Sequence, residues 1–137
     1  MSAFSVWRTG SEARPPGRAA TLSAAERIAV RENGRVVLLK LDEIDWIEAA
    51  DNYVCLHCGA ETHLLRETMN AVEERLAPAR FVRIHRSAIV NIDRIKELHP
   101  WFRGDYQVIL RDGTKLILTK ANRQKLTAQV LLGWLAP

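Results

Sequence analysis

Two dipeptides, Asn33-Gly34 and Asp112-Gly113, interrupt short apolar runs in this chain of 137 residues. Asn-Gly and Asp-Gly favour two-residue hairpin turns because both turn residues need positive φ angles, which Asn, Asp and Gly adopt most easily. Four apolar runs of strand length flank the two turns: 27–30, 36–39, 106–110 and 115–118. The sequence therefore predicts antiparallel hairpins towards both ends of its ordered part.

Between these hairpins the chain offers more strands and little helix. Six further short segments predict strands: 44–49, 53–58, 62–65, 81–84, 88–90 and 95–98. Thr68 is expected to cap a short helix that stops at Pro78, and Thr119 a longer one. The longer helix would present one apolar stripe, expected to pack in the core: Leu126, Val130, Leu131 and Trp134. The predicted fold is mostly β, an arrangement of small antiparallel sheets with one short and one C-terminal helix.

The length allows one domain with a real core and is too short for two ordinary ones. Residues 1–25, which include Pro15-Pro16, have no apolar period and are expected to be a disordered or linker tail before a domain over 26–137. No segment is apolar enough for a membrane span or a secretory signal, so we expect no membrane partner. With only two cysteines no disulfide framework is expected, and the cytoplasm is the expected compartment.

A cluster of metal-binding residue types occurs at Cys55, His57 and Cys58, with His63 five residues later. The two-residue period of a strand places Cys55 and His57 on one face and Cys58 on the other. A tetrahedral zinc ion needs about four ligands on the same side, and no second Cys pair supplies the rest. We therefore expect no metal site and no cofactor, with structural thiols as the simpler interpretation.

The chain also lacks the patterns of an enzyme. Cys55 with His57 and Ser87 with His85 have no evident third group to orient a base. The acidic residues over 42–51 are expected to be solvated surface, and the glycines form no phosphate-binding loop. We expect no catalytic residues.

Charge is distributed unevenly and points to a polyanionic partner. Residues 80–137 carry eleven Lys and Arg against four Asp and Glu, whereas residues 37–79 carry three against nine. In the basic half, Arg83, His85 and Arg86 lie between apolar residues that anchor the backbone. A guanidinium group suits both phosphate and the guanine edge.

A second basic group is expected at the start of the last helix, where backbone N–H groups also favour an anion. Its members are Lys120, Asn122, Arg123 and Lys125. Each group alone is more often a solvated surface, but the two together favour nucleic-acid binding.

Two blocks, at 44–54 (IDWIEAADNYV) and 81–91 (FVRIHRSAIVN), resemble the LytTR-type DNA-binding domain, as does Asp112-Gly113. The family pattern is D-I-x-x-I-E-A-x-x-N-Y followed by F-x-R-x-H-R-S-x-x-V-N. The resemblance runs from about Glu26 to Leu132. It implies a strand-rich fold and a bacterial transcription regulator, the output domain of a two-component response regulator, that inserts loops into successive grooves of a duplex.

Carried over by position, the resemblance implies a set of DNA-binding residues on three segments: Asn52, Tyr53, Arg83, His85, Arg86, Ser87, Lys120, Asn122 and Arg123. The last segment, 119–122, reads TKAN where the family more often has Ser-Arg with further basic or aromatic residues. For His85 and Asn91, a structural role within their own loop is an equal alternative.

The sequence thus predicts sequence-specific binding to double-stranded DNA at paired repeats, with a second copy on the adjacent repeat and an upstream sensor or receiver as further candidate partners. The main alternative is a protein-interaction adaptor or antagonist that keeps the fold without binding DNA. RNA binding is a weaker alternative because the exposed aromatic candidates are scattered. A redox or metal sensor through Cys55 and Cys58 is the most remote.

Overall fold

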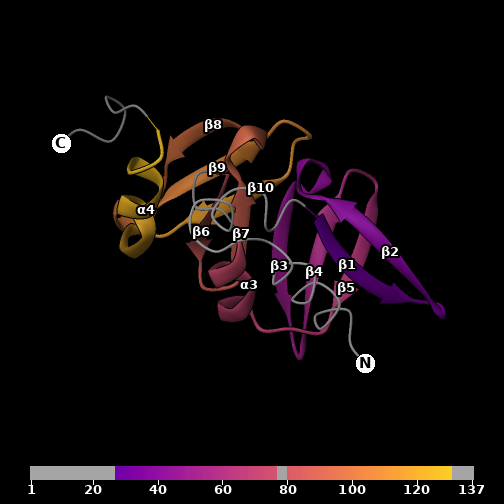
Figure 1. Ribbon diagram of the computed structural model, residues 1–137. Coiled ribbons are helices and arrows are strands. Elements are labelled where there is room, and N and C mark those ends of the chain that lie inside the picture. The colour runs from indigo at the N-terminus through magenta and orange to yellow at the C-terminus, as the bar shows by residue number, and fades with distance from the viewer. Residues whose placement is uncertain (1–26, 77–79, 131–137) are drawn as a thin grey trace. The chain divides into compact units, whose positions relative to one another are not determined.

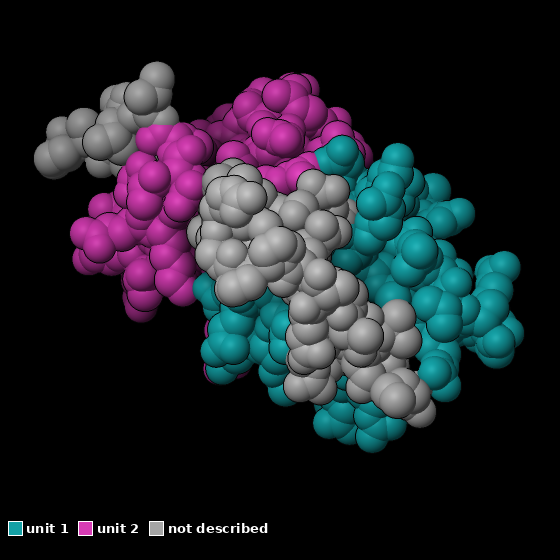
Figure 2. All heavy atoms as spheres, in the orientation of Figure 1, with its two compact units in different colours: residues 1–77 teal, residues 78–137 magenta. Residues whose placement is uncertain are grey.

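The computed structural model describes residues 27–76 and 80–130, and the predicted tail over 1–25 lies outside them. The chain divides into two compact units, residues 1–77 and 78–137, shown in teal and magenta in Figure 2. Each unit is built from short antiparallel strands (Figure 1). The mostly-β prediction is therefore confirmed. Among the described residues no helix has the length and hydropathy needed to cross a bilayer.

Unit 1 begins with the predicted hairpin of β1 (Arg27–Glu32) and β2 (Arg35–Lys40). Asn33 and Gly34 between the strands both have positive φ, 52° and 77°, as a tight turn of this kind requires. A 3-10 turn, η1 (Leu41–Glu43), follows β2.

Three more strands of unit 1 pair in succession: β3 (Trp46–Ala50), β4 (Tyr53–Cys58) and β5 (Glu61–Leu65). The strand β4 alternates as predicted, with Val54 and Leu56 fully buried. The register sets Glu48 of β3 opposite Cys55 of β4.

The short helix α3 (Met69–Arg75) follows β5. As predicted, Thr68 caps it, since the Thr68 hydroxyl accepts a 3.0 Å hydrogen bond from the Ala71 amide. Met69 and Val72 are the buried residues of this helix. It ends at Arg75, before Pro78, which itself lies outside the described residues.

Unit 2 contains a hairpin and a three-stranded sheet. The hairpin is β6 (Phe81–His85) with β7 (Ala88–Asn91), and η2 (Ile92–Arg94) leads into β8 (Ile95–Pro100). The turn η3 (Phe102–Gly104) connects β8 to β9 (Tyr106–Leu110), which pairs with β10 (Lys115–Leu118) across Asp112-Gly113. Both predicted hairpins are thus present.

The predicted long C-terminal helix differs from the structure. A 3-10 turn, η4 (Lys120–Asn122), precedes a short helix α4 (Arg123–Thr127) that packs against β6 (Figure 1). Leu126 is buried as expected, whereas Leu131 and Trp134 lie outside the described residues. The Thr119 side chain does not cap the turn because its hydroxyl lies against the backbone of β6.

Candidate nucleic-acid interface

The turn between β6 and β7 is shaped by a contact between His85 and Ser87. The Ser87 amide donates a 3.1 Å hydrogen bond to His85 Nδ1, and the Ser87 hydroxyl lies 2.9 Å from the same nitrogen. Because Nδ1 accepts the amide hydrogen, the neutral ring carries its proton on Nε2. Both residues are half-buried, so they set the shape of the turn and leave the Nε2–H edge as the donor of the imidazole.

Arg83 binds the backbone of the same turn. Its Nε donates to the His85 carbonyl at 3.2 Å and its Nη2 donates to the Arg86 carbonyl. These contacts hold a half-buried guanidinium inside the turn. The structure therefore gives Arg83 a positioning role, and the Arg86 side chain is the exposed guanidinium of the turn.

Asn91, at the end of β7, is structural as well. Its side chain is only 2% exposed, and its Oδ1 accepts a 3.0 Å hydrogen bond from the Asp93 amide. A buried group that already satisfies the first turn of η2 is not presented to a duplex.

The two basic segments of unit 2 are brought together by Thr119. The Thr119 amide donates a 2.9 Å hydrogen bond to the Ile84 carbonyl, and the Thr119 hydroxyl lies 3.4 Å from the same oxygen. Ile84 directly precedes His85, and Thr119 directly precedes Lys120. The β6–β7 turn and η4 are therefore neighbours, although 35 residues separate the two bonded positions.

Within η4 and α4, the members of the second basic segment differ in exposure. The Lys120 side chain is exposed, whereas Asn122 is half-buried and its Nδ2 donates a 2.7 Å hydrogen bond to the Thr119 hydroxyl. The half-buried Arg123 donates from Nη1 to the Gly104 carbonyl at 3.2 Å and lies 6.0 Å from the centre of the Tyr106 ring. Lys120 is thus the most available of the three predicted side chains.

The sequence predicts that the backbone N–H groups at the start of the last helix favour an anion. In the structure a carboxylate of the chain itself takes that position. The Asp105 carboxylate accepts a 2.8 Å hydrogen bond from the Lys120 amide. This contact satisfies one of the N–H groups that the predicted helix start would have offered to a phosphate. The carboxylate also joins the loop between β8 and β9 to η4.

That loop carries exposed residues that are not among the predicted DNA-binding residues. Trp101 is 46% and Phe102 is 70% exposed, with ring centroids 5.1 Å apart. Arg103 is exposed and has a positive φ of 56°. The sequence signal that could have found these residues is the Trp-Phe-Arg-Gly run between two predicted strands. The run does not alternate apolar and polar residues as a half-buried strand does, so its aromatic rings are expected to be exposed.

The remaining predicted residues, Asn52 and Tyr53, lie in unit 1 at the turn between β3 and β4. Both are exposed, and Asp51 before them has a positive φ of 58°. The Arg66 guanidinium carbon lies 5.9 Å from the centre of the Tyr53 ring. A tight turn thus presents both side chains to solvent.

The cysteines have the properties of structural thiols rather than of activated nucleophiles. Burial, with the nearby Asp45, Glu43 and Glu61 carboxylates, raises the pKa of Cys58 to about 11. Burial and Glu48 also raise the pKa of Cys55. Reactive cysteines have a lowered pKa, so both thiols are poor nucleophiles at neutral pH.

Comparison with known proteins agrees with this arrangement. The family profile described as the LytTr DNA-binding domain matches residues 34–130. The chain belongs to the LytTR family of DNA-binding domains. This confirms the resemblance seen in the sequence, and a DNA-binding family agrees with the expectation that the chain is not an enzyme.

The LytTR domain also occurs in larger relatives. The chain is 30% identical over 100 residues to the sensory transduction protein LytT of Bacillus anthracis, covering 73% of this chain and 41% of the relative. It is 35% identical over 91 residues to the transcriptional regulatory protein LytR of Staphylococcus aureus, covering 66% of this chain and 37% of that protein. The chain therefore spans about two fifths of the length of these relatives.

A solved structure supports the fold. The LytTr DNA-binding domain from Bacillus cereus superposes with a TM-score of 0.70 and covers 78% of this chain and 98% of its own. The sequence identity is 17%, so this likeness concerns the LytTR fold alone.

Proposed function

We propose that this LytTR domain recognises a specific double-stranded DNA sequence and that the protein containing it regulates transcription. The observation that carries the proposal is the hydrogen bond from Thr119 to Ile84, because it joins two basic segments into one surface of unit 2. Relatives named as a sensory transduction protein and a transcriptional regulatory protein support the same role.

The exposed cations of this surface are suited to the phosphate backbone. Arg86, Lys120 and Arg103 are exposed on the β6–β7 turn, on η4 and on the loop between β8 and β9. Contacts from Lys and Arg to phosphates supply most of the affinity for DNA and make it depend steeply on salt. We expect the three side chains to neutralise phosphates, with Arg86 also able to read a guanine edge.

Positioned groups on the same surface support base readout. His85 presents an Nε2–H donor because Ser87 occupies Nδ1, and Arg83 holds the backbone on either side of Arg86. Contacts to base edges require side chains that are held in place before binding, since phosphate contacts carry little sequence information. In unit 1, the exposed Asn52 and Tyr53 are proposed as further DNA contacts.

We further propose that the binding sites are paired repeats, each repeat taking one copy of the domain in successive grooves. Loops rather than a recognition helix would enter the grooves, because α4 has only five residues and carries a half-buried Arg123. An upstream sensor or receiver is the proposed source of the input signal, since the relatives are much longer than this chain.

Selection from a random pool of DNA duplexes tests this function. Enriched duplexes are then titrated with the full chain by fluorescence anisotropy over a salt series. We expect a paired repeat and an affinity that falls steeply as salt rises. Weak, salt-sensitive binding without an enriched sequence would show that the chain has only a basic surface and would contradict sequence-specific recognition. A folded protein that binds no duplex would favour the adaptor alternative.

A further inference from the structure

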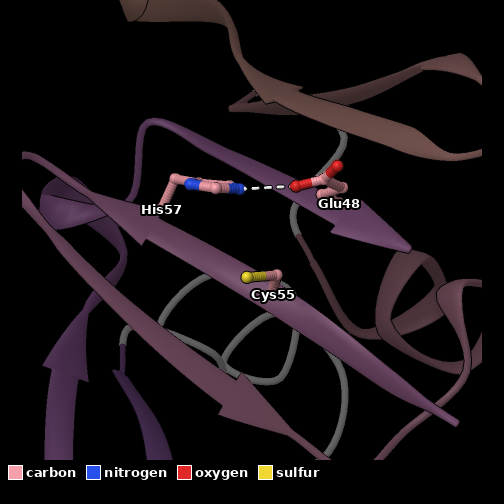
Figure 3. A group of neighbouring side chains, drawn as sticks. All are labelled: Glu48, Cys55 and His57. Carbon is pink, nitrogen blue, oxygen red and sulfur yellow. Dashed lines mark hydrogen bonds and ion pairs between the residues drawn. The ribbon is translucent and has the colours of Figure 1, made fainter. Parts of the chain in front are cut away.

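Three side chains of metal-binding type converge on one face of β3 and β4. Glu48 comes from β3, and Cys55 and His57 come from β4 (Figure 3). One ligand atom of each lies within 4.8 Å of the others, and all three residues are half-buried. The pairing register explains the convergence, because Glu48 stands directly opposite Cys55 while His57 lies two residues further along the same face.

The spacing of Cys55, His57 and Cys58 argued against a metal here, because it places Cys58 on the opposite face of the strand. The structure supports that separation of the two cysteines and supplies a third ligand from another strand, which the spacing within β4 could not reveal. The His57 Nε2 lies 2.9 Å from the Glu48 carboxylate, as the dashed line in Figure 3 shows.

The imidazole of His57 is held in place by an aromatic neighbour. The Trp46 and His57 rings are stacked, with centroids 4.3 Å apart and planes 6° from parallel. The stacking fixes the plane of the imidazole, and Nε2 is aimed at Glu48. A ligand whose ring orientation is fixed in advance loses less freedom when it binds an ion.

We propose that Glu48, Cys55 and His57 form a site for a divalent ion of the zinc class, with water in a fourth position. Thiolate, imidazole and carboxylate are all ligands of Zn²⁺, and a thiolate disfavours Mg²⁺ and Ca²⁺. Bond lengths of about 2.0–2.3 Å set the ligand atoms of one tetrahedral ion about 3.3–3.6 Å apart. The His57–Glu48 distance of 2.9 Å is shorter than this spacing, and the ligand atoms of the whole group lie within 4.8 Å of one another, so binding an ion requires the three side chains to adjust.

Binding follows a simple balance. The Cys55 thiol releases its proton to solvent. His57 Nε2 gives up the proton that it donates to Glu48, and the neutral imidazole carries its proton on Nδ1 instead, so that the Nε2 lone pair binds the ion. No oxidation or reduction takes place. The ion then bridges β3 and β4.

The test uses the full, tag-free chain with Zn²⁺ and Co²⁺ as probes. Competition with a chromogenic chelator measures the stoichiometry and affinity for Zn²⁺. Co²⁺ reports the ligands directly, because a cobalt–thiolate bond gives a charge-transfer band in the near ultraviolet. We expect one ion per chain and a thiolate band with Co²⁺.

Substitutions assign the ligands. Cys55→Ser should abolish the band, and His57→Ala and Glu48→Gln should each weaken Zn²⁺ binding at least tenfold. Cys58→Ser is the matched control, because it removes the thiol on the opposite face of β4, and should keep the band and the affinity. Far-UV circular dichroism checks that each variant is folded.

Three results would overturn the site: no equivalent of Zn²⁺ bound at micromolar concentration, a band that survives Cys55→Ser, or a loss as large in Cys58→Ser as in Cys55→Ser. Zinc binding by His63, which lies 2.9 Å from Glu32, would give no thiolate band and would count against the proposal. Glu48→Gln keeps the size of its side chain, so the test does not depend on the folding of the cysteine variants.

Discussion

The Thr119 amide donates its hydrogen to the Ile84 carbonyl, and this one contact places η4 beside the β6–β7 turn. Ile84 is fully buried, as is Leu118, the residue before Thr119. The junction between the two basic segments therefore rests on the core of unit 2. A surface assembled on buried strand ends keeps its shape without a recognition helix.

Removing the exposed guanidinium of the β6–β7 turn should weaken DNA binding selectively. We expect Arg86→Ala to reduce the binding free energy on the selected duplex by about 1–3 kcal/mol. Lys115→Ala is the control, because it removes one exposed positive charge at the far end of β10 from Thr119. Equal affinities of Arg86→Ala and the parent at physiological salt would remove Arg86 from the interface.

Arg83 should affect binding through the turn rather than through phosphate. Arg83→Lys keeps the charge but cannot reproduce two hydrogen bonds to the turn carbonyls from one planar group. We expect a weaker affinity with an unchanged slope of log affinity against log salt. Each lost phosphate contact lowers that slope by about 0.9, so a changed slope in Arg83→Lys would indicate direct contact with DNA.

The contact between Asp105 and the Lys120 amide should contribute to stability. Asp105→Ala leaves the amide of η4 without its carboxylate, and we expect the free energy of unfolding to fall by about 1 kcal/mol in a urea titration. Asp105→Asn retains an acceptor oxygen and should lose less. The same loss in both variants would show that the charge, and not the hydrogen bond, matters.

The aromatic pair of the loop between β8 and β9 should matter for binding more than for folding. Phe102 is 70% exposed, so Phe102→Ala should change the free energy of unfolding by no more than about 0.5 kcal/mol. Because this loop is joined to η4 through Asp105, we expect several-fold weaker binding to the selected duplex by anisotropy. Unchanged affinity would place the pair outside the DNA interface.

The raised pKa of the Cys58 thiol should make the protein less stable in alkaline solution. Its pKa rises from 9.0 to about 11 in the folded chain, so between these values the unfolded chain releases the proton first. The contribution of the protonated Cys58 thiol to the free energy of unfolding is fully present below pH 9 and is lost as the pH rises towards 11. The free energy of unfolding should fall less steeply over this range in Cys58→Ala than in the parent. Parallel curves would contradict the raised pKa.

Features set by neighbouring residues could be predicted from the sequence. The turn at Asn33-Gly34 and the cap at Thr68 depend on conformational preferences and on contacts within four residues, which a single sequence displays. The alternation of β4 is equally local, and it separated Cys55 from Cys58 correctly.

Features that depend on distant pairing could not be predicted in the same way. The bond between Thr119 and Ile84 spans 35 residues, and the approach of Glu48 to Cys55 needs the register of β3 on β4. The C-terminal helix is shorter than expected. Thr119 does not cap it, because its amide and hydroxyl contact the Ile84 carbonyl of β6, and the regular helix α4 spans only Arg123–Thr127. Local patterns identified the basic residues but not which of them, such as Arg83, bind their own backbone.

Arg83 binds the carbonyls of His85 and Arg86 and so holds the shape of the β6–β7 turn. The exposed group that the turn presents is a different side chain, that of Arg86. The side chain at position 86 makes no hydrogen bond that the structure records among residues 27–76 and 80–130, so exchanging it leaves the backbone support intact. If Arg86 reads the target as proposed, position 86 is a place where a single codon can change the preferred DNA sequence, in a laboratory library or during the divergence of duplicated genes.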